Sequence, residues 1–249
     1  HILLGPTRPA GLHDLPDRGR IGVEKVAVAY PGGPAQGCQV PPGCTQGDWP
    51  CYCAAGVLPC LPIAAPSCQF PPACSGVGCT LPNLQVSSNG SDTAGWTGFN
   101  TGTSANNIRS FLAQGPCDPP PAGPRGNSSP PVTNVGGTID LNNGINSAGN
   151  NNVFDLTKCL YDNNQGCAID GNGNIIPGQR GRIFAIPIFD SGSPSCTANF
   201  NQSFPGVGFA TIEITSVSLS NPRTIAITTL ANKTATSAPP GGQCFGTDC

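Results

Sequence analysis

The sequence predicts a mainly β fold: an antiparallel β-sheet or sandwich domain with one or two short helices and a disulfide-rich irregular segment. Three observations lead to this prediction. The longest apolar, β-branched runs lie in the last third of the chain, two short segments carry helix-capping residues, and eight of the 14 cysteines fall between Cys38 and Cys79. We divide the chain into an extended arm with a first strand (1–30), a cysteine- and proline-rich segment (31–80) and a β-rich domain (81–249).

The N-terminal arm is recognised by its lack of periodicity. Residues 1–20 hold three prolines and three glycines without a repeating apolar pattern, which is typical of an extended segment. Residues 21–30 (IGVEKVAVAY) are rich in β-branched side chains and predict a strand. Because the sequence contains no Met and starts at His1, we expect a processed N-terminus from which any secretion signal or anchor has been removed.

The cysteines indicate an oxidising compartment. Thiols as close as Cys51 and Cys53 would be a liability in a reducing cytosol, whereas disulfides each stabilise a fold by roughly 2 to 4 kcal/mol. The even number permits seven bridges, but eight cysteines alone allow about 105 pairings, so the connectivity stays open. We expect an extracellular or cell-surface location. The residues predicted to form disulfides are Cys38, Cys44, Cys51, Cys53, Cys60, Cys68, Cys74, Cys79, Cys117, Cys159, Cys167, Cys196, Cys244 and Cys249.

Two short helices are predicted in the β-rich domain. The first spans residues 104–112, with Ser104 as its N-cap, and stops before Gly115; the second starts after Asn152. The apolar positions that share one helix face are Ile108, Phe111 and Leu112 in the first and Val153, Leu156 and Leu160 in the second.

The strongest strand patterns come late in the chain. They are residues 182–190 (RIFAIPIFD), 207–219 (VGFATIEITSVSL) and 223–230 (RTIAITTL). Asn221-Pro222 marks a turn between the last two. Pro187 cannot donate to a β-ladder, so we expect its strand to lie at a sheet edge or to be bulged there. Residues 117–131 predict a proline-rich loop, and 132–141 two short strand pieces.

The composition excludes partners that are recognised by charge. Charged residues make up 10% of the chain, against about 25% in ordinary soluble domains. The net charge is −2 and no Lys/Arg cluster occurs, so nucleic-acid binding is not expected. No apolar run approaches the about 20 residues that a membrane-spanning helix needs, so we expect no membrane span. A neutral surface rich in Asn, Ser, Thr and Gly does not repel copies of itself.

Catalytic and metal-binding patterns are weak. The only histidines, His1 and His13, lie in the arm, where a general base is hard to hold in place. A terminal His with a second His can also chelate copper, so a secreted copper enzyme stays open as a second alternative. No Cys-x2-Cys pair of the kind that binds zinc or attaches haem occurs. We expect no catalytic residue, no metal and no cofactor.

Two further motifs have simple explanations that we favour over a functional one. Residues 170–174 (DGNGN) resemble the start of a calcium loop, but the position that needs a bidentate Glu is Gly181, so Asx-Gly turns are the better interpretation. Four Asn-x-Ser/Thr sequons also occur, a number close to the chance expectation in a chain so rich in these residues. The sequons begin at Asn89, Asn127, Asn201 and Asn232.

Several blocks between residues 81 and 230 occur in the order found in a known family. They are 94–100 (AGWTGFN), the helix 104–112, 117–120 (CDPP), 137–145 (GTIDLNNGI), 182–190 and 207–217. Together they resemble the extracytoplasmic region of TadE/TadG-like proteins, which belong to the assembly of Flp-type pili. The resemblance implies a pilus-like role and transfers no catalytic residue. The family typically has a hydrophobic N-terminal helix that this chain lacks, which weakens a membrane-anchored role and leaves room for a released, self-assembling subunit. The cysteine-rich segment of this chain has no counterpart in the family.

The function expected from these features is that of a non-enzymatic extracellular structural protein. It would be a subunit of a filament, pilus-like appendage or surface layer, with copies of itself as partners. In such an assembly the arm 1–20 could add a strand to an exposed sheet edge of a neighbour. A surface adhesin or glycan-binding module is the alternative, because Trp49, Trp96 and Phe99 could stack on sugars, although buried core aromatics are commoner.

Overall fold

A computed structural model describes residues 40–45, 47–70, 82–88, 92–113, 115–117, 137–142, 152–192, 196 and 201–230. The helices in this part are α1 (Trp49–Ala54), α2 (Ala105–Leu112) and α3 (Val153–Asp162), with the 3-10 turns η1 (Ser67–Gln69) and η2 (Gly115–Cys117). The strands are β1 (Ile63–Pro66), β2 (Asn83–Ser87), β3 (Gly95–Thr97), β4 (Thr138–Asn142), β5 (Gly166–Ile169), β6 (Ile175–Gly181), β7 (Ile183–Phe189), β8 (Ser203–Ser218) and β9 (Thr224–Leu230). The mainly β fold with short helices is confirmed; the arm and first strand lie outside the described residues.

Five of the strands close into a barrel. Around the ring, β1 pairs with β3, β3 with β4, β4 with β8, β8 with β7, and β7 with β1. Four of these pairings are antiparallel, and β1–β7 is parallel. Strand direction cannot alternate at every step around an odd ring, so a closed barrel of five strands needs at least one parallel pair. The parallel seam, absent from the sequence-based expectation, is thus a consequence of closure.

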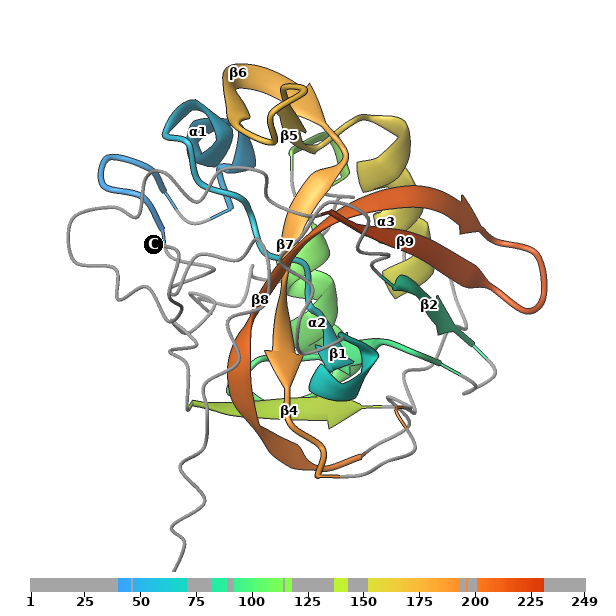
Figure 1. The fold of residues 1–249 in the computed structure, drawn as a ribbon. Helices are drawn as coiled ribbons and strands as arrows, with labels where there is room; N and C mark the ends of the chain where they lie inside the picture. Colours follow the sequence, from blue (N-terminus) through green and yellow to red (C-terminus); the bar gives the residue numbers. More distant parts are fainter. Residues whose placement is uncertain are drawn as a thin grey trace, which may run out of the picture.

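The sheet extends beyond the barrel on two sides (Figure 1). Strands β9 and then β2 continue from β8, and β5 and then β6 continue from β7. Strand β8 belongs to both the barrel and its extension: its first half pairs with β4 and β7, and its second half forms a long hairpin with β9. Figure 1 shows β8 curving around the body of the molecule as a single ribbon.

Strand β7 lies in the interior of the sheet, which corrects the expectation of an edge strand. It pairs with β8 on one side and with β1 and β5 on the other, and all seven of its residues are buried. Ala185 donates its N–H to the Pro59 carbonyl, and its own carbonyl accepts from the Leu61 N–H. Backbone groups two residues apart in a strand point the same way, so the Pro187 nitrogen, which cannot donate, also faces the side of β1. Only two β1 residues pair regularly there, and a bulge follows between Ile188 and Phe189, as expected near a proline.

Both predicted helices are present, with the predicted caps. The Ser104 hydroxyl accepts a hydrogen bond from the Asn107 N–H at 3.2 Å. The Asn152 side chain caps α3, and the Asp155 carboxylate bonds back to the Asn152 N–H, which completes a capping box. The apolar faces predicted for both helices are buried and form one core cluster with side chains from β7, β8 and β9, apart from Phe111, which is buried in a second cluster.

The segment 31–80 is more regular than its prolines suggested. Where it is described it forms the helix α1, capped by Asp48, and the barrel strand β1. Pro50 stands in the first turn of α1, where no intrahelical donor is needed. Strand β1 is buried throughout and pairs with β3 and β7. The described part of the cysteine-rich segment therefore contributes a strand to the barrel.

Candidate functional site

The disulfides form the framework that connects the barrel to its surrounding segments. Of the 14 cysteines, nine are described and all nine are disulfide-bonded. The bridges with both partners described are Cys44–Cys51, Cys53–Cys167, Cys68–Cys196 and Cys117–Cys159; Cys60 is also bonded. The other predicted positions, Cys38, Cys74, Cys79, Cys244 and Cys249, lie outside the described residues. This number of disulfides indicates an oxidising compartment.

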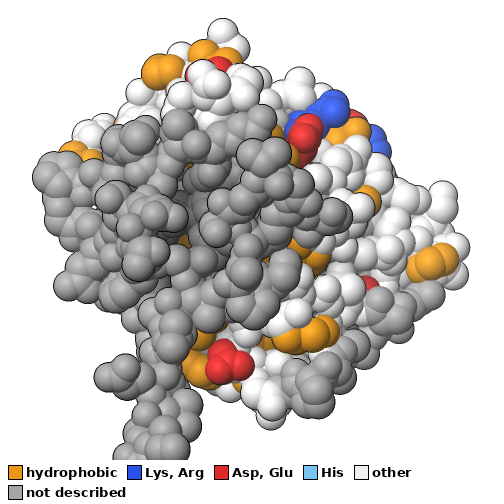
Figure 2. All heavy atoms as spheres, viewed as in Figure 1, with side chains coloured by type: hydrophobic (Ala, Val, Ile, Leu, Met, Phe, Trp, Pro, Cys, Tyr) orange, Lys and Arg blue, Asp and Glu red, His pale blue; other side chains and the backbone are white. Residues whose placement is uncertain are grey.

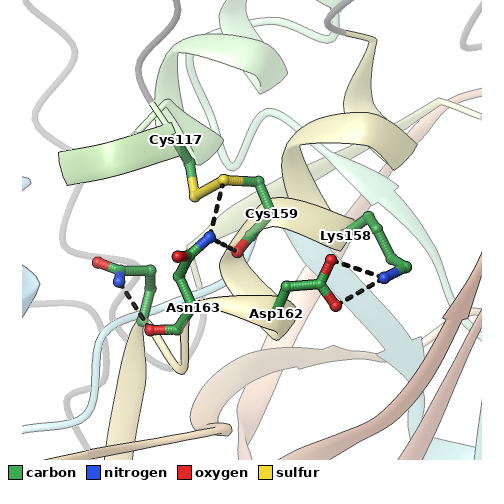
Figure 3. Close-up of a disulfide and its surroundings, with 6 residues drawn as sticks. Cys117, Lys158, Cys159, Asp162 and Asn163 are labelled. Atoms are coloured by element: carbon green, nitrogen blue, oxygen red, sulfur yellow. Dashed lines mark hydrogen bonds and ion pairs between the residues drawn. A yellow bond between two sulfur atoms is a disulfide. The ribbon is translucent and has the colours of Figure 1, made fainter.

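Three of the four bridges join segments that are far apart in the chain. They span 114, 128 and 42 residues, so each closes a long loop, and Cys53–Cys167 fixes α1 to strand β5. Cys117–Cys159 fixes η2 to α3 and is shown in Figure 3. There the Asn163 amide donates to the Cys159 sulfur at 3.3 Å and to its carbonyl at 2.9 Å. The bridge thus lies at the C-terminal cap of α3.

Charged side chains gather around α3 and neutralise one another. Lys158 and Asp162 form an exposed i,i+4 pair at 2.6 Å, and Arg223 lies 3.6 Å from Asp155. Arg182 stacks on the Tyr161 ring, with its guanidinium carbon 3.9 Å from the ring centroid, and donates from Nε to the Tyr161 carbonyl. The Arg182 contact caps the helix C-terminus. Because these charges face each other or the helix end, the cluster offers no unbalanced charge to a ligand.

One buried carboxylate was not anticipated from the sequence. Asp92 is 8% exposed, and its Oδ1 has no hydrogen-bond partner. The carboxylate accepts from the N–H and hydroxyl of Ser87; burial raises the pKa of Asp92, and these two bonds only partly offset the effect. The local sequence Ser91-Asp92-Thr93 is typical of a polar turn, so nothing in it signals burial. Within the described residues, no group of three His, Cys, Asp or Glu side chains could hold a metal ion.

Both edges of the extended sheet are partly blocked to strand addition. At the outer edge of β2, Gln85 donates its N–H to the Thr93 hydroxyl at 2.8 Å and accepts from the Thr93 and Ala94 N–H groups. At the other edge, β6 contains Pro177 and a left-handed Gly178, and its register with β5 is interrupted. Proline and bulges are the usual means of blocking an edge. These features leave little free ladder for an added strand in this part of the chain.

The calcium-like segment 170–174 forms the turn between β5 and β6. One Asp170 oxygen accepts from the Asn172 and Asn174 N–H groups at 2.8 and 2.9 Å, and the other accepts from the Asn174 amide at 3.2 Å. These bonds, with Asn174 contributing most, lower the pKa of Asp170. Gly173 adopts a φ of 87°, as Asx-Gly turns require. The carboxylate is thus engaged by the backbone of its own turn, in agreement with the turn interpretation.

The three candidate sugar-stacking aromatics are buried. Trp49 and Trp96 are each 4% exposed, and Phe99 is 0% exposed. Trp96 packs edge-on against Phe154 with ring centroids 5.7 Å apart, and Phe99 packs in the same way against Phe111 at 5.0 Å. None of the three can present a ring face to a glycan. The proposed aromatic platform is therefore a misinterpretation of core residues, and the adhesin alternative loses the residues on which it was based.

The surface of the described part is mostly neutral and polar. In Figure 2, Lys, Arg, Asp and Glu side chains form only small separate patches among uncharged ones. Among described residues, Leu219 in the β8–β9 turn is the one large apolar side chain that is substantially exposed. No described helix is long and apolar enough to cross a bilayer. The copper candidates His1 and His13 lie outside the described residues, and that alternative stays a prediction.

Comparisons with protein-family models, with curated protein sequences and with solved structures find no match to this chain. The resemblance to TadE/TadG-like proteins therefore depends on the sequence blocks alone. Where those blocks are described they form core elements: residues 94–99 lead through β3 into a buried turn, 182–190 contain β7, and 207–217 lie in β8. The resemblance thus concerns segments that determine the fold and identifies no functional site.

Proposed function

We propose that this chain is a non-enzymatic extracellular structural protein, a subunit of a filament, pilus-like appendage or surface layer that is built from copies of itself. The observation that carries the proposal is the set of long-range disulfides around a closed barrel. Bridges of this kind constrain the unfolded chain and allow a subunit to persist outside the cell. Rigidity obtained in this way suits a protein that bears load or packs in arrays.

The surface chemistry supports the same proposal. Uncharged hydroxyl and amide side chains can form hydrogen bonds across a contact without the desolvation cost of burying charge. The charges that are described around α3 already face one another, or, for Arg182, the Tyr161 ring and the helix end. Copies of the chain can therefore approach without strong repulsion, since the net charge of the chain is only −2.

The mode of contact that we propose differs from simple strand addition. Because the edges at β2 and β6 are partly blocked, the arm 1–20 would cross to a neighbour and pack through side chains rather than extend the described sheet. Negative-stain microscopy of the native protein should show fibres or a regular layer. Dispersed single particles over a wide range of concentration and pH would contradict self-assembly.

Deleting residues 1–20 separates the arm's contribution from that of the barrel. We expect the shortened protein to fold, with an unchanged unfolding transition, and to remain monomeric in sedimentation. A matched control replaces residues 1–20 with a Gly/Ser sequence of equal length, which keeps the length but removes the side chains. Polymerisation by either variant at the wild-type rate would show that the arm is not the contact.

A further inference from the structure

Among the four sequons, Asn201-Gln202-Ser203 is the one that the structure describes in full, and its asparagine is exposed in the fold. Asn201 lies two residues before the start of β8 and is exposed. The residues that follow it are held in place: the Gln202 carbonyl accepts from the Leu141 N–H at 3.1 Å, and the Ser203 hydroxyl donates to Asp140. The acceptor asparagine is therefore the exposed first residue of a tripeptide whose other two residues are bonded to β4.

We propose that Asn201 carries an N-linked glycan. The oxidising compartment indicated by the disulfides is also the setting in which Asn-x-Ser/Thr sites are glycosylated. In the transfer, the Asn201 Nδ2 forms a bond to the anomeric carbon of a sugar that is carried on a lipid pyrophosphate. The bond from that carbon to the pyrophosphate oxygen breaks, and the amide proton passes to a base of the transferring enzyme. The lipid-linked oligosaccharide is the co-reactant, and no oxidation occurs.

The folded geometry also sets the order of events. Ser203 pairs with Asp140 in the β4–β8 ladder, and Asp140 itself donates its N–H to the Phe99 carbonyl at 2.6 Å. A sequon hydroxyl that is engaged in this way cannot be recognised by a transferring enzyme. Transfer therefore precedes the pairing of β4 with β8, while residues 201–203 are still extended and accessible. The attached glycan then points away from the core, because Phe204 is the first buried residue of β8.

A glycan at this position has a physical consequence for the molecule. Few charges are available to keep the chain hydrated, since charged residues make up only 10% of the sequence. A bulky hydrated group beside the β4–β8 seam would keep this end of the barrel out of contacts between molecules. The inference does not depend on self-assembly, because it follows from the exposure of Asn201 and the compartment alone.

The experiment is peptide mass spectrometry on the protein purified from its native source, after reduction and alkylation. Trypsin releases residues 183–223 as one peptide, in which Asn201 is the only sequon asparagine. We expect a mass excess equal to a whole number of sugar residues, localised to Asn201 by fragmentation. An unmodified Asn201 in this material would overturn the proposal.

Three variants produced in the same host identify the acceptor. Asn201→Gln and Ser203→Ala should lose the mass excess, whereas Ser203→Thr, which preserves the sequon and a hydroxyl for Asp140, should keep it. Asn201→Gln should leave the thermal unfolding of deglycosylated protein unchanged, because the side chain is exposed. A mass excess that persists in Asn201→Gln would place the modification on another residue and also overturn the assignment.

Discussion

Gly98→Ala tests the packing of the barrel most severely. A Cβ at this position would lie 1.8 Å from the Gly102 carbonyl oxygen and 2.7 Å from its carbon. Ordinary contact begins near 3.4 Å, and both neighbours are backbone atoms, so the turn itself must move. That turn is held by the Thr101 N–H and hydroxyl, which both donate to the Gly98 carbonyl. The substitution therefore cannot be accommodated by rotating a side chain.

The turn also carries the fully buried Phe99, which adopts a φ of 57°, a left-handed conformation that is costly for a bulky residue. Overpacking costs roughly 1 to 3 kcal/mol, and partial loss of the Phe99 packing adds to it. We expect Gly98→Ala to lower the free energy of unfolding by about 3 kcal/mol, and Tm by about 6 to 12 °C for a chain of this size.

The assay is thermal and denaturant unfolding with the disulfides intact. Gly171→Ala is the matched control, because a Cβ at that position meets no atom within 4 Å and its backbone is not left-handed. The control should stay within about 0.5 kcal/mol of the wild type. If Gly98→Ala is as stable as the control, the described geometry of this turn is wrong and the reasoning from it fails.

Two further predictions concern buried groups. Burial raises the folded-state pKa of Asp92, so the neutral carboxyl is tolerated at low pH, and this contribution to stability is lost as the pH rises through the folded pKa and the carboxyl ionises. Asp92→Asn should therefore raise Tm at pH 7 relative to the wild type and have little effect near pH 3. A larger gain at pH 3 than at pH 7 would reverse the assigned sign. The partners of Cys53–Cys167 lie 114 residues apart, and those of Cys44–Cys51 lie 7 residues apart. Loop-closure entropy predicts that these bridges stabilise the fold by about 4.8 and about 2.4 kcal/mol, respectively. Replacing both cysteines of the first bridge by Ala should thus destabilise more in denaturant unfolding than the same change in the second, and equal losses would contradict the entropic explanation.

The elements that were predicted correctly are those determined by local sequence. Ser104 and Asn152 cap their helices because their side chains accept hydrogen bonds from N–H groups two or three residues away. Such a local interaction can be recognised from the sequence. Strands β8 and β9 were predicted for a similar reason, from the patterns at 207–219 and 223–230. Alternating apolar and polar residues on both sides of a turn are typical of a hairpin. In each case the deciding contacts lie within a few residues of one another.

The features that were missed depend on residues far apart in the chain. Pro187 suggested an edge strand or a bulge. A bulge follows it, but β7 lies in the interior because β1, more than 100 residues earlier, pairs with it in the parallel seam of the barrel. The short strands β3 and β5 have too few residues for a pattern to be seen. The burial of Asp92 likewise results from the packing of segments that no local motif connects.

Disulfide mapping of the native protein without reduction tests the account most directly. Digestion should yield linked peptides that join Cys53 to Cys167 and Cys117 to Cys159, and no alkylated thiol should be found at these positions. Free thiols at these cysteines, or bound metal in place of the bridges, would remove both the oxidising compartment and the rigidity on which the proposed structural role depends.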